Sequence, residues 1–186
     1  LMGQRGVTPD AARTVIRTNT TAIAAVAVKR GDADAMICGL AGDYAANLHE
    51  VEFVIGHAPG VRQLAALSGL ILPTGAYFIC DTYVQSNPTA DDIVRMTMLA
   101  AGEIGRFGMT PKVALVSHSN FGGRDSPSAL KMREALAKIQ DLEPDFEVDG
   151  EMHADAALDE EIRRRVFPGS TLTGSANLLI MPTLDA

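Results

Sequence analysis

Tryptophan is absent from this sequence, cysteine occurs only twice, and aromatic residues make up only 5% of the chain. The two cysteines, Cys38 and Cys80, are far apart, which excludes the short spacings of a zinc cluster and the framework of a disulfide-rich fold. We therefore expect a cytoplasmic chain whose thiols stay reduced. With so few aromatic side chains, alanine, valine, leucine and isoleucine must fill the core, as is common in layered α/β proteins.

The sequence also lacks a long apolar run and an excess of positive charge, and we expect no signal peptide. Its longest apolar runs, 22–28 and 64–72, are too short to span a bilayer, and residues 1–6 lead directly into a polar helix start. The formal net charge of −7 argues against nucleic acid or an anionic membrane as a partner. An anionic ligand would need a local basic site, for which the candidates are Arg124, Lys131 and Arg133.

The 186 residues, of which 47% are hydrophobic, are enough for one domain or for one and a half. Thr8-Pro9-Asp10 has the cap, proline and acid of a helix start, and Gly31 is typical of a helix end. Gly56 and the Pro59-Gly60 pair break the chain and indicate a hinge. We predict a helix over 8–30 with a pause at Thr18-Asn19, a short buried strand over 35–39, and a helix over 44–55.

From residue 57 onward, strands alternate with helices. Pro73-Thr74-Gly75 predicts a hairpin, and Thr89 has the position of an N-cap. This alternation predicts an α/β fold with three layers, in which helices cover both faces of a mostly parallel sheet. We assign residues 1–56 to part of a first α/β subdomain and 57–186 to a second. The predicted strands are 64–72, 76–80, 112–117, 146–149 and 177–181, and the predicted helices are 90–107, 127–140 and 154–166.

The glycine-rich loop Asn120–Pro127 follows the strand at 112–117 and precedes a helix. Ser126 and Pro127 have the residue types of an N-cap and a first helical position. Glycines let a ligand approach the backbone, and a helix N-terminus attracts anions. The loop therefore predicts a cradle for a phosphate or acyl phosphate, with Arg124 as a forked cationic donor. It matches neither the P-loop nor the dinucleotide-binding pattern, so an ordinary surface connection stays open as the alternative.

Other polar residues follow the predicted strands, where ligands of parallel sheets bind. His118 is interpreted either as a donor to an acyl or phosphate oxygen or as a hydrogen-bonded loop residue. Thr89 is interpreted as a cap whose helix N-terminus could also face the ligand. Cys38 is interpreted as a small buried residue rather than a nucleophile. For the polar group Asp149, Glu151, His153 and Asp155, capping and loop hydrogen bonds are favoured over a metal or acid–base site.

Four segments, taken in order, carry a resemblance to a known family. They are Asn87–Ala90, Val113–Gly122, Asp149–Leu158 and Gly174–Pro182. In this order and spacing they resemble the phosphate acetyl/butyryltransferase family, over nearly the whole chain. Further segments are similar to one subgroup of that family, the C-terminal domain of bacterial NADP-dependent malic enzymes: Ala33–Gly39, Ser117–Gly122 and Gly150–Asp155.

The resemblance implies a two-domain cleft architecture of the isocitrate/isopropylmalate dehydrogenase type and an assembly of at least two copies. It also implies a regulatory role, in which acetyl-CoA or a related acyl-CoA acts on an attached malic enzyme part. That part would use NADP and a divalent metal, while this chain would hold no cofactor or metal. Together with the loop, the resemblance predicts a site for phosphate or acyl-CoA formed by Asn87, Thr89, His118, Ser119, Asn120, Gly122, Gly123 and Arg124.

One segment departs from the pattern of the active transferases. The family has Ser-Gly-Ala followed by histidine, hydroxyl residues and an arginine, whereas this chain has Cys38–Leu48, and no arginine occurs between Arg30 and Arg62. Asp43 would repel a bound phosphate by about 1 kcal/mol or more. Because the family's late Ser-Arg segment and catalytic aspartate are expected beyond Ala186, we expect a fragment without catalytic residues. Three hypotheses remain: an acyl-CoA-binding regulatory domain of a malic enzyme, an active phosphate acyltransferase, and a structural oligomerisation domain.

Overall fold

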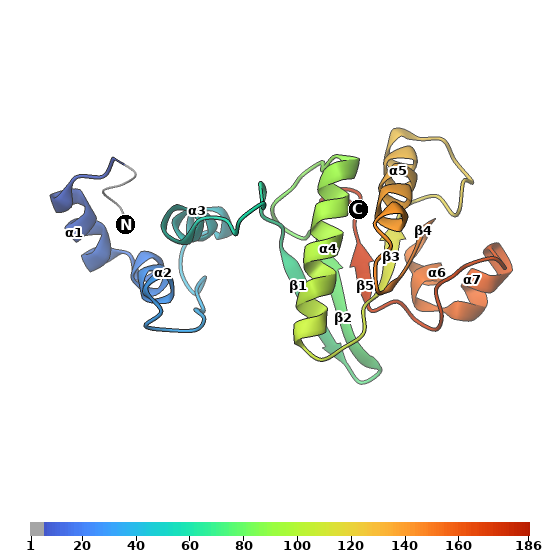
Figure 1. Ribbon diagram of the computed structural model, residues 1–186, viewed down its shortest axis with the longest axis horizontal. Helices are drawn as coiled ribbons and strands as arrows, with labels where there is room; N and C mark the ends of the chain where they lie inside the picture. Colours follow the sequence, from blue (N-terminus) through green and yellow to red (C-terminus); the bar gives the residue numbers. More distant parts are fainter. Residues whose placement is uncertain (1–5) are drawn as a thin grey trace. The chain divides into compact units, whose positions relative to one another are not determined.

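The computed structural model describes residues 6–186, which divide into two compact units, 6–62 and 63–186. The chain break at Gly56 predicts a division between residues 56 and 57, whereas the boundary between the compact units falls between Arg62 and Gln63. Figure 1 labels the helices and strands of each unit. No helix within the described part of the chain is long and apolar enough to cross a membrane.

Residues 6–62 of the first unit form three helices. Thr8 caps the first of them by accepting a hydrogen bond from the Ala11 N–H at 3.3 Å, and Gly31 ends the second in a left-handed conformation with φ 77°. Buried Ala22, Ala25 and Val54 form the centre of its core. The helices are α1 (Pro9–Thr18), α2 (Thr20–Arg30) and α3 (Tyr44–Ile55), which confirms the predicted pause at Thr18-Asn19.

The strand predicted over residues 35–39 does not form. Ile37 is 100% exposed, and Cys38 is exposed as well instead of buried. The physical reason is pairing, because a strand needs a neighbour for its backbone N–H and C=O groups and residues 6–62 contain no other strand. The apolar run therefore stays an irregular connection between α2 and α3.

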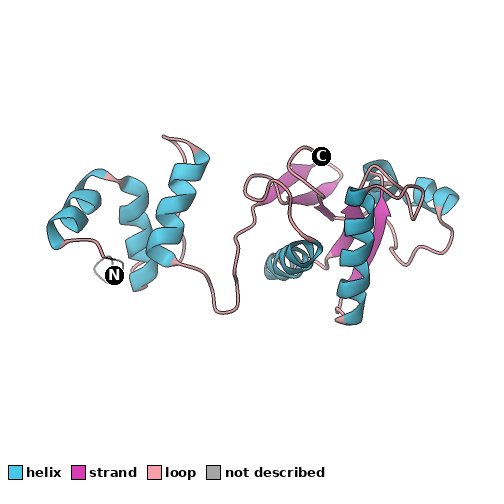
Figure 2. Cartoon of the chain, turned by 90° about the horizontal axis from the view of Figure 1, so that it is seen from above, coloured by secondary structure: helices cyan, strands magenta, loops and turns pink. Residues whose placement is uncertain are grey.

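The second unit contains one five-stranded sheet with the order β1-β2-β5-β3-β4. The first two strands form the predicted antiparallel hairpin, in which Leu72 pairs with Gly75. All other pairs are parallel, which confirms the mostly parallel sheet. Figure 2 shows its strands in magenta beside the helices. The strands are β1 (Leu67–Leu72), β2 (Gly75–Cys80), β3 (Lys112–Val116), β4 (Glu147–Met152) and β5 (Leu178–Ile180).

Helices cover both faces of this sheet, as predicted. Alternate residues of β3 point to opposite faces: Val113 and Leu115 pack in a core with α4 and α5, whereas Ala114 and Val116 pack in a second core with α6. The three layers follow from this alternation, because a strand with helices on both faces buries every side chain, and the side chains of β3 from Val113 to Val116 are all apolar. The helices are α4 (Ala90–Arg106), α5 (Pro127–Asp141), α6 (Ala154–Leu158) and α7 (Glu160–Val166).

Three predicted boundaries are wrong. The helix expected over 154–166 is two helices, because Asp159 leaves the helical conformation and caps α7 by accepting from the N–H groups of Glu161 and Ile162. The strand expected to end at Asp149 continues to Met152, so that Asp149 and Gly150 lie inside β4. The first hairpin strand begins at Leu67 and not at residue 64.

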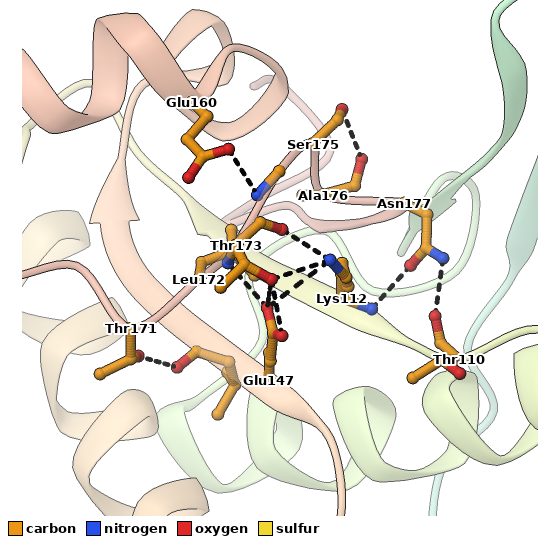
Figure 3. Close-up of polar contacts among 12 residues, drawn as sticks. Thr110, Lys112, Glu147, Glu160, Thr171, Leu172, Thr173, Ser175, Ala176 and Asn177 are labelled. Carbon is orange, nitrogen blue, oxygen red and sulfur yellow. Dashed lines mark hydrogen bonds and ion pairs between the residues drawn. The ribbon is translucent and has the colours of Figure 1, made fainter.

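Structural polar contacts close the edge of the sheet at which the parallel strands begin (Figure 3). The Lys112 ammonium donates to the Thr173 carbonyl at 2.8 Å, and Glu147 accepts from the Thr173 N–H at 2.7 Å. The Asn177 side chain accepts from the Lys112 N–H at 2.7 Å and donates to the Thr110 carbonyl at 2.9 Å. These bonds connect β3, β4 and β5 to one another. The ligand site expected from the sequence lies at the opposite edge, where the parallel strands end.

Candidate ligand site at the carboxyl edge of the sheet

The four parallel strands end side by side. Ile180 at the end of β5 is in register with Cys80 on β2 and with Leu115 on β3, and Val116 is in register with Met152 on β4. The segments that follow these residues therefore meet at one edge, which we call the carboxyl edge: 81–89, 117–126, 153 and 181–184. Asp149 and Glu151, which were expected to follow a strand, lie within β4 instead.

The glycine-rich loop is folded around a carboxylate of the chain itself. Glu151 is 0% exposed, and its Oε1 accepts from the Ser119 hydroxyl at 2.7 Å and from the Gly122 N–H at 3.0 Å. The Ser119 hydroxyl in turn accepts from the Arg124 N–H at 3.0 Å, and the Phe121 N–H donates to the Glu151 carbonyl at 2.7 Å. The second carboxylate oxygen, Oε2, is buried without a hydrogen-bond partner.

Acceptors of the chain itself thus occupy the backbone N–H groups of the loop that would have to bind an external anion. The Gly123 N–H donates to the Asn120 carbonyl at 2.9 Å, and the Asn120 side chain accepts from the His153 N–H at 2.7 Å. Gly122 has φ 85°, a left-handed conformation that turns its N–H toward Glu151. The structure brings the predicted loop residues together, but a phosphate held by their backbone stays a prediction.

Side chains at the rim of this loop offer donors of another kind. His118 is exposed, and its Nε2 lies 3.0 Å from the Ser126 hydroxyl. Ser126 is the predicted N-cap of α5, where its hydroxyl accepts from the Ala129 N–H at 3.3 Å. The Arg124 side chain is exposed and, within residues 6–186, its guanidinium makes no hydrogen bond or ion pair. Arg124 and His118 can therefore contact a ligand without breaking the fold.

The other predicted ligand residues lie before α4. Thr89 forms a capping box with Asp92: the Asp92 N–H donates to the Thr89 hydroxyl at 3.2 Å, and the Thr89 N–H donates to the Asp92 carboxylate at 3.0 Å. The Asn87 side chain accepts from the Lys131 ammonium at 2.9 Å. Thr89 is therefore a structural cap, whereas Asn87 belongs to a contact that joins the segment before α4 to α5.

Lys131, one of the three basic candidates in the sequence, also lies at this edge. Its ammonium donates to Asn87 and, at 2.7 Å, to the Pro182 carbonyl after β5. Burial lowers the pKa of the Lys131 ammonium below its ordinary value. The sequence signal that could have found Lys131 is its position within the first two turns of the predicted helix that follows the glycine-rich loop.

Asp81 fixes the segment after β2. Its buried carboxylate accepts from four backbone N–H groups, those of Ala66, Tyr83, Val84 and Gln85, at 2.7 to 3.2 Å. A carboxylate satisfied by so many donors holds a loop rather than a ligand. The segment 82–86 is therefore held in place by Asp81 as it approaches Asn87.

Each unit also has an open cavity. In the second unit a cleft of about 400 Å³ adjoins the loop and is lined by residues that include Phe121, Arg133, Glu151 and Phe167. The first unit has a pocket of about 230 Å³, where the predicted departure from the active transferases lies; it is lined by Cys38, Gly39, Tyr44, Asn47, Leu48 and Val51. Across residues 6–186 no three His, Cys, Asp or Glu side chains are grouped so that they could hold a metal ion.

The chain is similar to known proteins over its whole length. It is 58% identical over all 186 residues to an NAD-dependent malic enzyme of Rhizobium meliloti (strain 1021) and 48% identical over the same length to an NADP-dependent malic enzyme of Escherichia coli (strain K12). The chain spans 24% of each of these enzymes. It is also 35% identical over 187 aligned positions to a phosphate acetyltransferase of Paracoccus denitrificans, where it covers 58% of that protein.

Solved structures agree with the sequence relatives. The EutD phosphotransacetylase from Staphylococcus aureus aligns with a TM-score of 0.85 and 26% identity, over 97% of this chain and 56% of that one. A phosphotransacetylase from Streptococcus pyogenes aligns with a TM-score of 0.83 and 27% identity, over 95% and 54%. The family model described as phosphate acetyl/butaryl transferase matches residues 1–186. The chain therefore belongs to the phosphate acetyl/butyryltransferase family.

Proposed function

We propose that this chain is the phosphotransacetylase-like regulatory part of an NADP-dependent malic enzyme, in which it binds acetyl-CoA or a related acyl-CoA as an effector. The catalytic part of such an enzyme, with its NADP and divalent metal, would oxidatively decarboxylate malate to pyruvate. The identity of 58% over the whole chain with a malic enzyme carries this proposal. One of the malic enzyme relatives is named NAD-dependent and another NADP-dependent. The catalytic part, which would bind the nucleotide, would determine which of the two is used.

The charges at the carboxyl edge support an anionic ligand. The Lys131 ammonium has two neutral acceptors, and the Arg124 guanidinium has no partner in the described chain. Phosphate groups such as those of CoA prefer forked guanidinium donors and uncompensated cations. Such a ligand would regulate only if it bound two states of the whole enzyme unequally.

The segment that departs from the active transferases argues against catalysis by this chain. The Asp43 carboxylate caps α3 by accepting from the Ala46 N–H at 2.8 Å, so the negative charge is fixed there by the fold. The nearby pocket has the apolar side chains of Leu48 and Val51 among its walls. The family holds an acyl phosphate with an arginine and with serine or threonine hydroxyls, and residues 38–48 contain none of these three residue types.

An edge of the sheet favours assembly with a second copy. Strand β1 lies at the end of the strand order, and Ile71 on it is 90% exposed between the half-exposed side chains of Leu70 and Leu72. Exposed apolar edge strands readily pair with other chains. We include self-association in the proposal, to be checked by light scattering of the eluting protein on size-exclusion chromatography.

The central experiment is a calorimetric titration of the protein with acetyl-CoA. We expect saturable binding that Arg124→Ala weakens by about 10-fold or more, because a charge-assisted hydrogen bond is worth about 1.5–3 kcal/mol. Arg106→Ala is the matched control, since Arg106 is an exposed arginine at the far end of α4 whose one ion pair among residues 6–186 is with Glu103. An equal loss in both variants would reflect net charge alone, and no heat with the unaltered protein would favour the purely structural alternative.

A second assay separates the regulatory role from the alternative of an active phosphate acyltransferase. The protein is incubated with acetyl-CoA and inorganic phosphate, and the release of free thiol is followed. We expect no phosphate-dependent release above the rate without protein. Turnover that required both substrates would overturn the regulatory assignment in favour of the transferase, for which the phosphate acetyltransferase relatives would be the precedent.

A further inference from the structure

The environment of the Lys131 amine differs from that of the other lysines. The chain has four lysines, Lys29, Lys112, Lys131 and Lys138. Lys138 lies seven positions beyond Lys131 on α5 and pairs with two carboxylates, Asp91 at 2.6 Å and Glu134 at 2.7 Å. Lys131 has no carboxylate partner among residues 6–186 and is half-buried at the carboxyl edge.

The two acceptors of Lys131 match the hydrogen-bonding capacity of a neutral amine. An ammonium has three N–H donors, and a neutral amine has two together with one lone pair. The amide oxygen of Asn87 and the carbonyl oxygen of Pro182 take two donors at 2.9 and 2.7 Å. Loss of the third proton therefore breaks neither bond and leaves a lone pair on the nitrogen.

The shifts in pKa agree with this geometry. Burial lowers the pKa of Lys131, whereas hydrogen bonds to Asp91 and Glu134 raise the pKa of Lys138. At a given pH the fraction of the side-chain amine that is neutral, and therefore nucleophilic, is larger for Lys131 than for Lys138. The two residues provide a comparison within one helix and one preparation.

We propose that Lys131 is an acylation site, at which an acyl thioester of the acetyl-CoA class transfers its acyl group to the side-chain nitrogen. The proposal rests on the proposed function, because the thioester must reach the carboxyl edge as a bound ligand. The acyl-CoA would then both bind at the carboxyl edge as an effector and modify a residue of that same site.

The step balances without any further reactant. The Nζ lone pair forms a bond to the thioester carbonyl carbon, the C–S bond breaks, and CoA leaves as a thiolate. The proton lost from nitrogen passes to that thiolate or to water, so that the products are an N-acyl-lysine and CoA. The amide product has a single N–H and no charge, so it can no longer donate to both Asn87 and Pro182.

The first test measures the reactivity of the amine with a reagent that needs no binding site. The folded protein is treated with a limiting amount of an N-hydroxysuccinimide ester of acetate, and acetylation at each lysine is quantified by peptide mass spectrometry. We expect Lys131 to react faster than Lys138 by up to about tenfold for each unit by which their pKa values differ, since the larger neutral fraction is partly offset by the lower nucleophilicity of a less basic amine. Asn87→Asp should slow the reaction at Lys131, because a carboxylate beside Nζ favours the ammonium, and should leave Lys138 unchanged.

The second test uses acetyl-CoA itself. We expect Lys131 to be acetylated ahead of Lys29, an exposed reference, by a larger factor than with the small ester, and an excess of free CoA to remove this advantage. Saturable binding of acetyl-CoA in the calorimeter without preferential acetylation of Lys131 would overturn the acylation site and leave the proposed function intact. Absence of binding would overturn both, and equal rates at Lys131 and Lys138 with the small ester would refute the reactive amine.

Discussion

The Ser119 hydroxyl donates a hydrogen bond of 2.7 Å to the Glu151 carboxylate in the interior of the second unit. Ser119 follows the end of β3, whereas Glu151 lies near the end of β4. Ser119→Ala would leave the Glu151 Oε1 with the Gly122 N–H as its one remaining donor and would deprive the Arg124 N–H of its acceptor. Because unsatisfied buried polar groups cost about 1–3 kcal/mol, we expect a loss of that size in the free energy of unfolding.

Urea unfolding followed by circular dichroism measures this loss. Ser86→Ala is the control, since Ser86 is exposed and contributes its backbone carbonyl to the fold. If Ser119→Ala were as stable as Ser86→Ala, the loop would not be organised around Glu151.

A buried arginine joins the two short helices on the other face of the sheet. Arg163 is 0% exposed, and its guanidinium donates to the carbonyls of Ala156 and Ala157 in α6 and to those of Leu172 and Gly174. Lysine has a single nitrogen and cannot reach four acceptors in this fork geometry. Arg163→Lys should therefore lower the free energy of unfolding by about 1–3 kcal/mol or more.

The neighbouring residue provides the control for this prediction. Arg164 is exposed and pairs with Glu160 at 2.7 Å, so Arg164→Lys should change the stability by less than about 1 kcal/mol. Equal stabilities of the two variants in guanidinium unfolding would contradict a structural role for Arg163.

Local signals in the sequence were enough to predict most elements of the fold. The caps at Thr8, Thr89 and Ser126 and the turn at 73–75 act within a few residues, and all four form as predicted. The strand at 35–39 failed because strand formation depends on a partner elsewhere in the chain, which an apolar run cannot reveal.

The same limit applies to the candidate site. The sequence shows that the loop has donors, but not that Glu151 comes from β4 to accept from them. Likewise, the half-buried position of Lys131 depends on Asn87 and Pro182, which lie far from it in the sequence. Residue types are readable from one sequence, whereas the partners that already satisfy them are a property of the fold.

Acid should weaken the capping box at the start of α4 in a predictable way. The hydrogen bond from the Thr89 hydroxyl holds the pKa of Asp92 below its ordinary value. A lowered folded pKa gives stability that is present above the unfolded value, about 3.9, and is lost as the pH falls through the folded value. Thr89→Ala should cost about 1 kcal/mol at neutral pH, and this difference should shrink in acid as Asp92 is protonated.

Urea unfolding at pH 7 and in steps below pH 4 follows this difference. Thr110→Ala is the control, because Thr110 is exposed and uses its backbone carbonyl in the fold. A difference between Thr89→Ala and the unaltered protein that stayed constant with pH would show that Asp92 has no part in it.

The two thiols should differ sharply in their reactivity. Burial, reinforced by the neighbouring Asp81 carboxylate, raises the pKa of the Cys80 thiol to about 12, whereas Cys38 is exposed in the first unit. Since the thiolate is the reactive form, iodoacetamide at pH 8 should alkylate Cys38 in the folded protein and leave Cys80 unmodified. Mass spectrometry should find one alkylated cysteine in native buffer and two in urea. Cys38→Ser should abolish the native reaction, and rapid alkylation of Cys80 in that variant would mean that the end of β2 opens in the folded state.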